Sequence, residues 1–269
     1  MRHRLARSVL AAMVALALVT FAVRMAGVAP PQVAGLVQVG VSAARLVALF
    51  IGGGLAWRCA HAMGEGNEAR TPWLLIAGWF AAFFAGTLVI STYTVIYGQR
   101  APLPSVADLF FALGYFALLG ALVLFIRAYH ASGFDLGSAR GHVAVAAGAA
   151  AALVASGVVI LAPIARAPEP LAARLTNLAY PAFDLCVLVP TLVLLRITLR
   201  FRGGGVWKVW ATLLAAVACM SFSDVVFGFV TSTTGLTVPM PAIDLLEIVT
   251  YAMAAFAIVV QADMIAREP

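Results

Sequence analysis

PLPSVADLFFALGY at residues 102–115 and PMPAIDLLEIVTY at residues 239–251 are two copies of one pattern. Each copy has a Pro-x-Pro element, then an aspartate, and then a tyrosine seven residues after that aspartate. Each also opens an apolar run of about 20 residues, the length of a helix that spans a bilayer. Proline and an acidic side chain are both typical of the first turn of a helix. The two stretches therefore predict two membrane-spanning helices that begin in the same way.

The composition of the whole chain agrees with a membrane location. Of its 269 residues, 64% are hydrophobic and 10% are charged, whereas a soluble domain has about 25% charged residues. Apolar runs of spanning length occur eight times, so we predict an all-α integral membrane protein with eight transmembrane helices. The predicted spans are residues 6–28, 34–57, 73–97, 107–128, 143–164, 174–199, 207–232 and 241–263.

The basic residues predict the orientation, because cytoplasmic loops carry an excess of Lys and Arg. With the N-terminus in the cytoplasm, twelve Lys and Arg residues fall on the inner side and four on the outer side. This distribution predicts an N-in/C-in, multi-pass protein of the inner (plasma) membrane. The inner arginines also account for most of the net charge of +6. They suit the anionic lipids of the inner leaflet, so we expect the lipid bilayer as a partner and no nucleic acid.

The two opening stretches belong to a longer internal similarity. Trp79 aligns with Trp210, and Asp108 aligns with Asp244, at nearly the same offset along the chain. The offset between the two aspartates also aligns the first predicted span with the fifth. Since each unit has an even number of spans, both units would enter the membrane in the same direction. We predict a parallel 4+4 repeat, with residues 1–135 as a scaffold half and residues 136–269 as the half that carries the polar site.

Five carboxylates fall inside the predicted spans. Each would cost about 2.5–3.5 kcal/mol at the centre of a helix facing lipid, so these side chains should point into the bundle. Their positions along the helices place all five at the membrane midplane or in its outer half. This asymmetry predicts an acidic cavity that opens to the outer surface. The five residues are Asp108, Asp184, Asp224, Asp244 and Glu247.

Other polar residues extend this candidate site. Glu247 and Tyr251 share a helix face with Asp244, and two carboxylates so close together require a proton or a cation between them. Asn177 and Tyr180 form a stripe with Asp184 on a span that Pro181 and Pro190 should kink. Arg45 lies at the depth of Asp184, which predicts a buried ion pair between them, and Tyr93 could contribute a phenol. The candidate ligand-binding residues are Asp184, Asp244, Glu247, Asp224, Asp108, Tyr180, Tyr251, Tyr93, Arg45 and Asn177.

Structural roles explain some of these residues equally well. Ser105 and Asp108 have the spacing of a capping box, and we favour that role for Asp108 taken alone. The Arg45 pair is more often structural than ligand-binding, and Asp244 with Glu247 could form a structural network as readily as a site. The glycines Gly52 to Gly54 predict close helix packing. The histidines lie at cytoplasmic helix ends and their spacing fits no zinc pattern, so we expect neither a metal site nor a cofactor.

Three segments carry a resemblance to a known family. PSVADLFFALGYFALLGALVLFIR (residues 104–127), LAYPAFDLCVLVPTLVL (residues 178–194) and PAIDLLEIVTYAMAAFA (residues 241–257) resemble the N-terminal membrane regions of bacterial GGDEF/EAL proteins, which make or break cyclic di-GMP. The similarity covers about residues 35–265. It implies a multi-span sensor that signals to a cytoplasmic catalytic domain. The sequence contains no GGDEF or EAL motif, so the resemblance implies a sensor bundle that acts through a separate cytoplasmic signalling protein.

Three functions remain open from the sequence. The first is a membrane sensor or ligand-binding module whose outward-facing acidic and aromatic cavity binds a lipophilic or cationic small molecule. The second is a small membrane-embedded, terpene-cyclase-like enzyme, in which carboxylates exchange protons with a lipophilic substrate. The third is a proton- or cation-coupled transporter, although the first half lacks polar residues that match those of the second. The candidate catalytic residues are Asp184, Asp224, Asp244 and Glu247.

Overall fold

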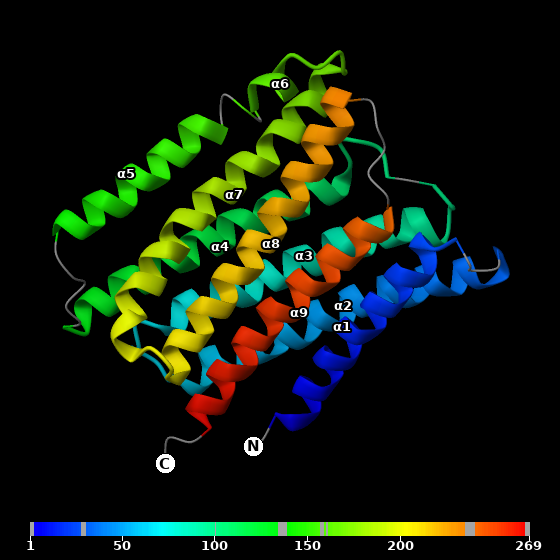
Figure 1. Cartoon of the computed structure of the whole chain (residues 1–269). Coiled ribbons are helices and arrows are strands. Elements are labelled where there is room, and N and C mark those ends of the chain that lie inside the picture. The colour runs from blue at the N-terminus through cyan, green and yellow to red at the C-terminus, as the bar shows by residue number, and fades with distance from the viewer. Residues whose placement is uncertain are drawn as a thin grey trace.

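The computed structural model describes residues 3–27, 31–99, 101–133, 139–156, 159, 161–234 and 240–266. Within these ranges the regular elements are all helical, which confirms the all-α prediction. The longer helices run back and forth in one tilted bundle (Figure 1). The elements are α1 (Arg4–Met25), α2 (Pro31–Ala62), α3 (Arg70–Val95), α4 (Val106–Ala131), α5 (Ala139–Ser156), α6 (Ala162–Ala165), α7 (Leu171–Ile197), the 3₁₀ helix η2 (Thr198–Phe201), α8 (Gly205–Thr234) and α9 (Met240–Ile265).

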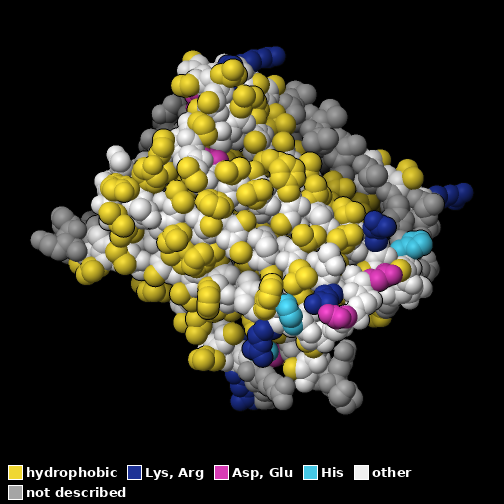
Figure 2. Space-filling view, turned by 180° about the vertical axis from the view of Figure 1, so that it is seen from behind, with side chains coloured by type: hydrophobic (Ala, Val, Ile, Leu, Met, Phe, Trp, Pro, Cys, Tyr) yellow, Lys and Arg dark blue, Asp and Glu magenta, His cyan; other side chains and the backbone are white. Residues whose placement is uncertain are grey.

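Seven helices in this described part of the chain are long and apolar enough to cross a membrane, namely α1, α2, α3, α4, α7, α8 and α9. Their outer faces are strongly hydrophobic. Figure 2 shows a broad area of hydrophobic side chains on one face, with histidines and charged side chains gathered toward its edge. The chain is therefore a multi-pass membrane protein, as its composition predicts.

The predicted fifth span differs from the other seven. Residues 143–164 fall on α5 and α6, which are separate elements, and residues 157, 158 and 160 lie outside the described part. The 18 residues of α5 rise about 27 Å at 1.5 Å per residue, slightly less than the hydrocarbon thickness of about 30 Å. The fifth span therefore stays a prediction, and the other seven predicted spans correspond to the seven helices of spanning character among the described residues.

Six of the helices form a closed ring. Around the ring, α2 packs on α3, α3 on α4, α4 on α7, α7 on α8, α8 on α9, and α9 again on α2. The other two long helices lie outside it, with α1 against α9 and α2, and α5 against α7. Both ends of the chain lie at the same end of the bundle (Figure 1), here called the terminal end.

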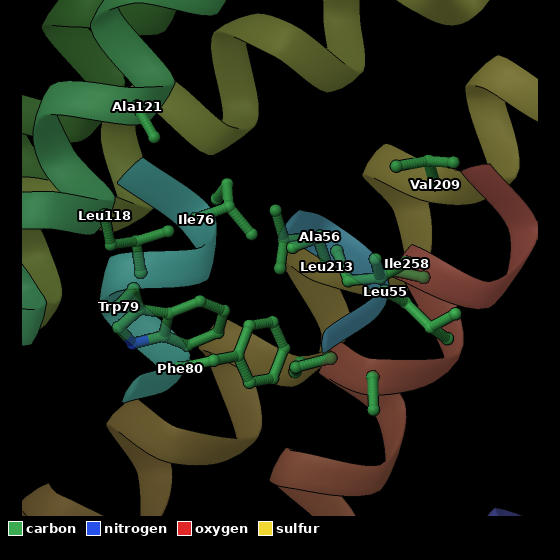
Figure 3. Close-up of a cluster of buried hydrophobic side chains, with 14 of the residues drawn as sticks. Leu55, Ala56, Ile76, Trp79, Phe80, Leu118, Ala121, Val209, Leu213 and Ile258 are labelled. Carbon is green, nitrogen blue, oxygen red and sulfur yellow. The ribbon is translucent and has the colours of Figure 1, made fainter. Parts of the chain in front are cut away.

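The ring is filled by hydrophobic side chains toward the terminal end. Trp79 and Phe80 of α3 are buried there against Leu213 of α8 and other apolar residues (Figure 3). A Cβ atom on Gly52 of α2 would overlap the ring of Phe80, so the glycine lets α2 and α3 approach closely, as predicted. This packed core closes the terminal half of the ring and leaves the opposite half for polar residues.

Candidate functional site

A cavity of about 250 Å³ lies inside the ring, in the half away from the terminal end. Side chains from all six ring helices line it, together with residues 101–103 and 105 of the segment between α3 and α4. The apolar part of the wall includes Phe83, Ile90, Phe111, Met220 and Phe227. The polar part includes seven of the ten residues predicted from the sequence, namely Arg45, Asp108, Asn177, Tyr180, Asp224, Glu247 and Tyr251.

Arg45 of α2 holds the two carboxylates of α9 together. Its Nη2 donates to Asp244 Oδ1, and its Nη1 forms an ion pair with Glu247 Oε2 at 2.8 Å. Arg24 of α1 donates to the other oxygen of Asp244, with 2.5 Å between Nη1 and Oδ2. The side chains of Arg45 and Asp244 are 6% and 3% exposed, whereas that of Glu247 is 32% exposed because it borders the cavity. The cation required between these neighbouring carboxylates is thus supplied by the protein itself.

The predicted ion pair between Arg45 and Asp184 is wrong. Arg45 binds the α9 carboxylates because α2 packs against α9, while α7, which carries Asp184, packs against α4 and α8. Depth in the membrane was a correct guide to burial but gave no information on which helices are neighbours. Asp184 is 2% exposed and lies behind the cavity wall.

Tyr115 joins two carboxylates on the opposite side of the ring. Its hydroxyl lies 2.7 Å from Asp184 Oδ1 and 3.1 Å from Asp224 Oδ2. A phenol has one hydrogen to donate and can also accept. Both contacts are full hydrogen bonds only when one of the carboxyls carries a proton and donates it to the phenol oxygen. The arrangement is a pair of carboxyl groups bridged by one phenol, and Asp224 is the member of the pair that lines the cavity.

Asp108 has both a structural role and a place in the cavity wall. Its Oδ2 accepts a hydrogen bond from the Ser105 backbone N–H at 2.5 Å and one from the Ser105 hydroxyl at 3.0 Å. These contacts belong to the capping box predicted at the start of α4. The Tyr180 hydroxyl donates to the remaining oxygen, also at 2.5 Å. Asp108 thus ties the start of α4 to α7 and is fully engaged by these donors.

The described lining of the cavity does not include Asp184, Asp244 or Tyr93. The first two lie in the layer behind it, each held by a residue that does reach the cavity. Tyr93 packs edge-on against Tyr97 near the end of α3, with 5.6 Å between the ring centroids. The structure therefore does not bring Tyr93 to the carboxylates in the way that its depth in the membrane predicted.

Several residues of the site are missing from the sequence prediction. Tyr115 carries a detectable signal, because it occupies the place in the first opening stretch that Tyr251 occupies in the second. Thr87, Ser223 and Thr250 also line the cavity, but a hydroxyl in an apolar helix is too common to stand out. The first half of the chain supplies Arg45, Thr87, Asp108 and Tyr115, although it was expected to serve as scaffold.

No group of three His, Cys, Asp or Glu side chains that could hold a metal ion occurs within the described residues. The arrangement offers instead hydrogen-bond acceptors, aromatic faces and one guanidinium around a small hollow. A comparison of the chain with protein-family models, with curated proteins and with solved structures finds no match.

Proposed function

We propose that the chain is a membrane-embedded ligand-binding module that acts as a sensor for a small molecule. The observation that carries this proposal is the cavity of about 250 Å³ at the centre of a ring of six helices. A concave, mostly apolar pocket with a few convergent polar groups is the usual form of a small-molecule site. Because each ring helix contributes to the wall, a bound molecule would contact every helix whose position could change.

The finer topology belongs to the same proposal. Two parallel four-helix units, at residues 1–135 and 136–269, would be related by an axis along the membrane normal. The order of helices around the ring supports this, since α2, α3 and α4 are followed by α7, α8 and α9. With the N-in/C-in orientation in the inner membrane, and α5 completing eight spans, the cavity opens to the outer face. This agrees with the resemblance to sensor regions of GGDEF/EAL proteins.

A chain of ion pairs links the cavity to α1, the helix whose other end begins on the cytoplasmic side in this orientation. Glu247 borders the cavity and pairs with Arg45, which shares Asp244 with Arg24 of α1. A ligand that draws Glu247 away from Arg45 would leave Arg45 bound to Asp244 alone. That change would alter the ion pair between Asp244 and Arg24 of α1. Since α1 lies outside the ring, a shift of α1 leaves the contacts among the six ring helices in place. A cytoplasmic signalling partner would then read the position of α1, provided that the ligand binds the two packings with different affinity.

The packed core favours a binding protein over a carrier. Trp79, Phe80 and their neighbours fill the ring between the cavity and the terminal end. A carrier would have to open this core in each cycle, whereas a sensor requires only a change in helix packing. An acid–base enzyme is the second candidate, because the carboxyl pair bridged by Tyr115 could supply a proton to a substrate. Loss of turnover of lipophilic substrates in Tyr115→Phe, with retained binding, would identify it.

Native mass spectrometry of the detergent-purified protein tests the proposal. We expect a retained small molecule in the wild type and its loss in Thr94→Trp, which places an indole in the cavity wall. The control is Leu113→Trp, which adds the same side chain on α4 at a position that is 52% exposed. If the Thr94→Trp and Leu113→Trp variants retain the same mass, the molecule is not in the cavity and the proposal fails.

A further inference from the structure

The chemistry of the cavity wall defines the class of ligand, provided that the cavity is the ligand site proposed above. Three carboxylates line it, namely Asp108, Asp224 and Glu247, against the single guanidinium of Arg45 among the described lining residues. Both terminal nitrogens of Arg45 are already engaged by Asp244 and Glu247. An anionic ligand would therefore have to displace a carboxylate, whereas a cationic one would meet an excess of negative charge.

Asp224 is the least compensated of the three carboxylates. Asp108 accepts hydrogen bonds from Ser105 and Tyr180, and Glu247 has its ion pair with Arg45. Among the described residues, Asp224 receives only the Tyr115 hydroxyl, which it shares with Asp184. A carboxylate in this setting requires either a proton or a cationic partner.

A second observation points to a ligand at the same place. The Thr250 hydroxyl lines the cavity, its residue is 2% exposed, and it has no hydrogen-bond partner in the described part of the protein. A buried hydroxyl without a partner costs about 1–3 kcal/mol, so such groups are normally satisfied by protein, water or ligand. A donor placed beside Asp224 could also donate to Thr250, since α8 and α9 are neighbours in the ring.

The remaining wall selects an organic cation rather than an inorganic one. Phe83 packs against Phe111 and Tyr251, with ring centroids 5.2 Å and 6.2 Å apart, and all three line the cavity. Aromatic faces attract ammonium groups and also accept an apolar body, whereas divalent ions prefer several oxygen ligands arranged around them. The volume of about 250 Å³ is below the range of about 300–1,000 Å³ that holds drug-sized ligands.

We propose that the ligand is a small monoamine in its ammonium form. Its nitrogen donates to the carboxylate of Asp224 and the hydroxyl of Thr250, and its apolar body lies against the rings of Phe83 and Phe111.

Calorimetric titration of the full-length protein in detergent tests this with three molecules of matched shape. They are 2-phenylethylammonium, the neutral propylbenzene and the anionic 3-phenylpropanoate. We expect the ammonium compound to bind at least tenfold more tightly than either of the others. Asp224→Asn and Thr250→Val should each weaken its binding several-fold and leave propylbenzene unaffected, while Glu65→Gln, on an exposed loop of the terminal end, should change neither affinity.

The outcomes separate the ligand class from the proposed function. If propylbenzene or 3-phenylpropanoate binds as tightly as the ammonium compound, the cavity is a ligand site but the cationic class is wrong. Equal binding of the ammonium compound to wild type, Asp224→Asn and Thr250→Val would also overturn the assignment. If none of the three binds while native mass spectrometry detects a retained neutral or anionic molecule, the class again fails. If no molecule of any class binds, the proposed function fails with it.

Discussion

Arg24 of α1 donates a hydrogen bond to Asp244 of α9, with 2.5 Å between Nη1 and Oδ2. A second pair, Arg7 with Asp263, joins the same two helices toward the terminal end. At the α-helical rise, the two arginines are separated by about 26 Å along α1 and the two aspartates by about 28 Å along α9. Both separations are close to the hydrocarbon thickness of about 30 Å. Ion pairs near both membrane surfaces thus join α1, which lies outside the ring, to α9 of the ring.

We expect the Arg24 and Asp244 side chains to be energetically coupled. Arg24→Gln and Asp244→Asn should each destabilise the protein, and the double variant should lose less than the sum of the two, by about 0.5–3 kcal/mol. The reason is that Asp244→Asn leaves Arg24 without its carboxylate, and Arg24→Gln removes the donor to one oxygen of Asp244, which keeps only Arg45. Unfolding in detergent, measured for all four proteins of the cycle, gives the coupling. Strictly additive losses would show that α1 is not held by this contact.

We expect replacement of Arg45 by a neutral residue or by lysine to destabilise the protein. Arg45→Met leaves Glu247 without its cation and leaves Asp244 with Arg24 alone, and breaking a buried pair in this way costs about 3–5 kcal/mol. Arg45→Lys keeps the charge but cannot reach both carboxylates with a planar fork, so we expect an intermediate loss. The measurement is the unfolding midpoint in detergent. A lysine variant as stable as the wild type would mean that charge alone, and not the bridge, is required.

Tyr115→Phe should disrupt the carboxyl pair. The change removes the hydroxyl that contacts Asp184 and Asp224 and leaves a buried acceptor unsatisfied, at a cost of about 1–3 kcal/mol. Infrared difference spectra should contain the band of a protonated carboxyl in the wild type, altered in Tyr115→Phe and weakened in Asp224→Asn. Tyr129→Phe, near the terminal end, serves as the control. If that band is absent from the wild type, neither acid of the bridged pair carries a proton.

The two glycines Gly52 and Gly54 should differ in their tolerance of larger side chains. A Cβ on Gly52 would overlap Phe80, whereas nothing described lies within 4 Å of a Cβ on Gly54. Gly52→Leu should therefore destabilise the protein by about 1–3 kcal/mol through overpacking, and Gly54→Leu should have little effect. Thermal unfolding of the two variants makes the comparison, and equal losses would contradict the α2–α3 packing described above.

Much of the fold and of the site follows from one physical constraint, the cost of burying charge in hydrocarbon. That cost predicts the helical membrane class and the inward placement of Asp108, Asp224 and Glu247. It does not predict neighbours, because a sequence gives the depth of a residue along its helix but not the order of helices around a ring. The predicted partner of Arg45 was wrong for this reason. Depth alone also could not distinguish Tyr93 from a residue that lines the cavity.

The bounds of helices within a long apolar run were a second limit on prediction from the sequence. The run at residues 143–164 is continuously apolar, but the structure describes it only in part, as α5 (Ala139–Ser156) and α6 (Ala162–Ala165), so one spanning helix there stays a prediction. Tyr115 was the opposite case, because its match to Tyr251 in the paired stretches was visible. Its role became clear only when α7 and α8 brought Asp184 and Asp224 to the same hydroxyl.

Thiol labelling in sealed vesicles of known orientation tests the central claim most directly. The background is a chain in which Cys59, Cys186 and Cys219 are replaced, and each variant then carries one new cysteine. Ile90→Cys lines the cavity, whereas Leu88→Cys lies on the same helix, 48% exposed on its outer surface. With a membrane-impermeant reagent, we expect Ile90→Cys to react from the outer face only and Leu88→Cys, which faces lipid, to remain unlabelled. Failure of Ile90→Cys to react, or its reaction from the face that carries the termini, would contradict an outward-opening cavity.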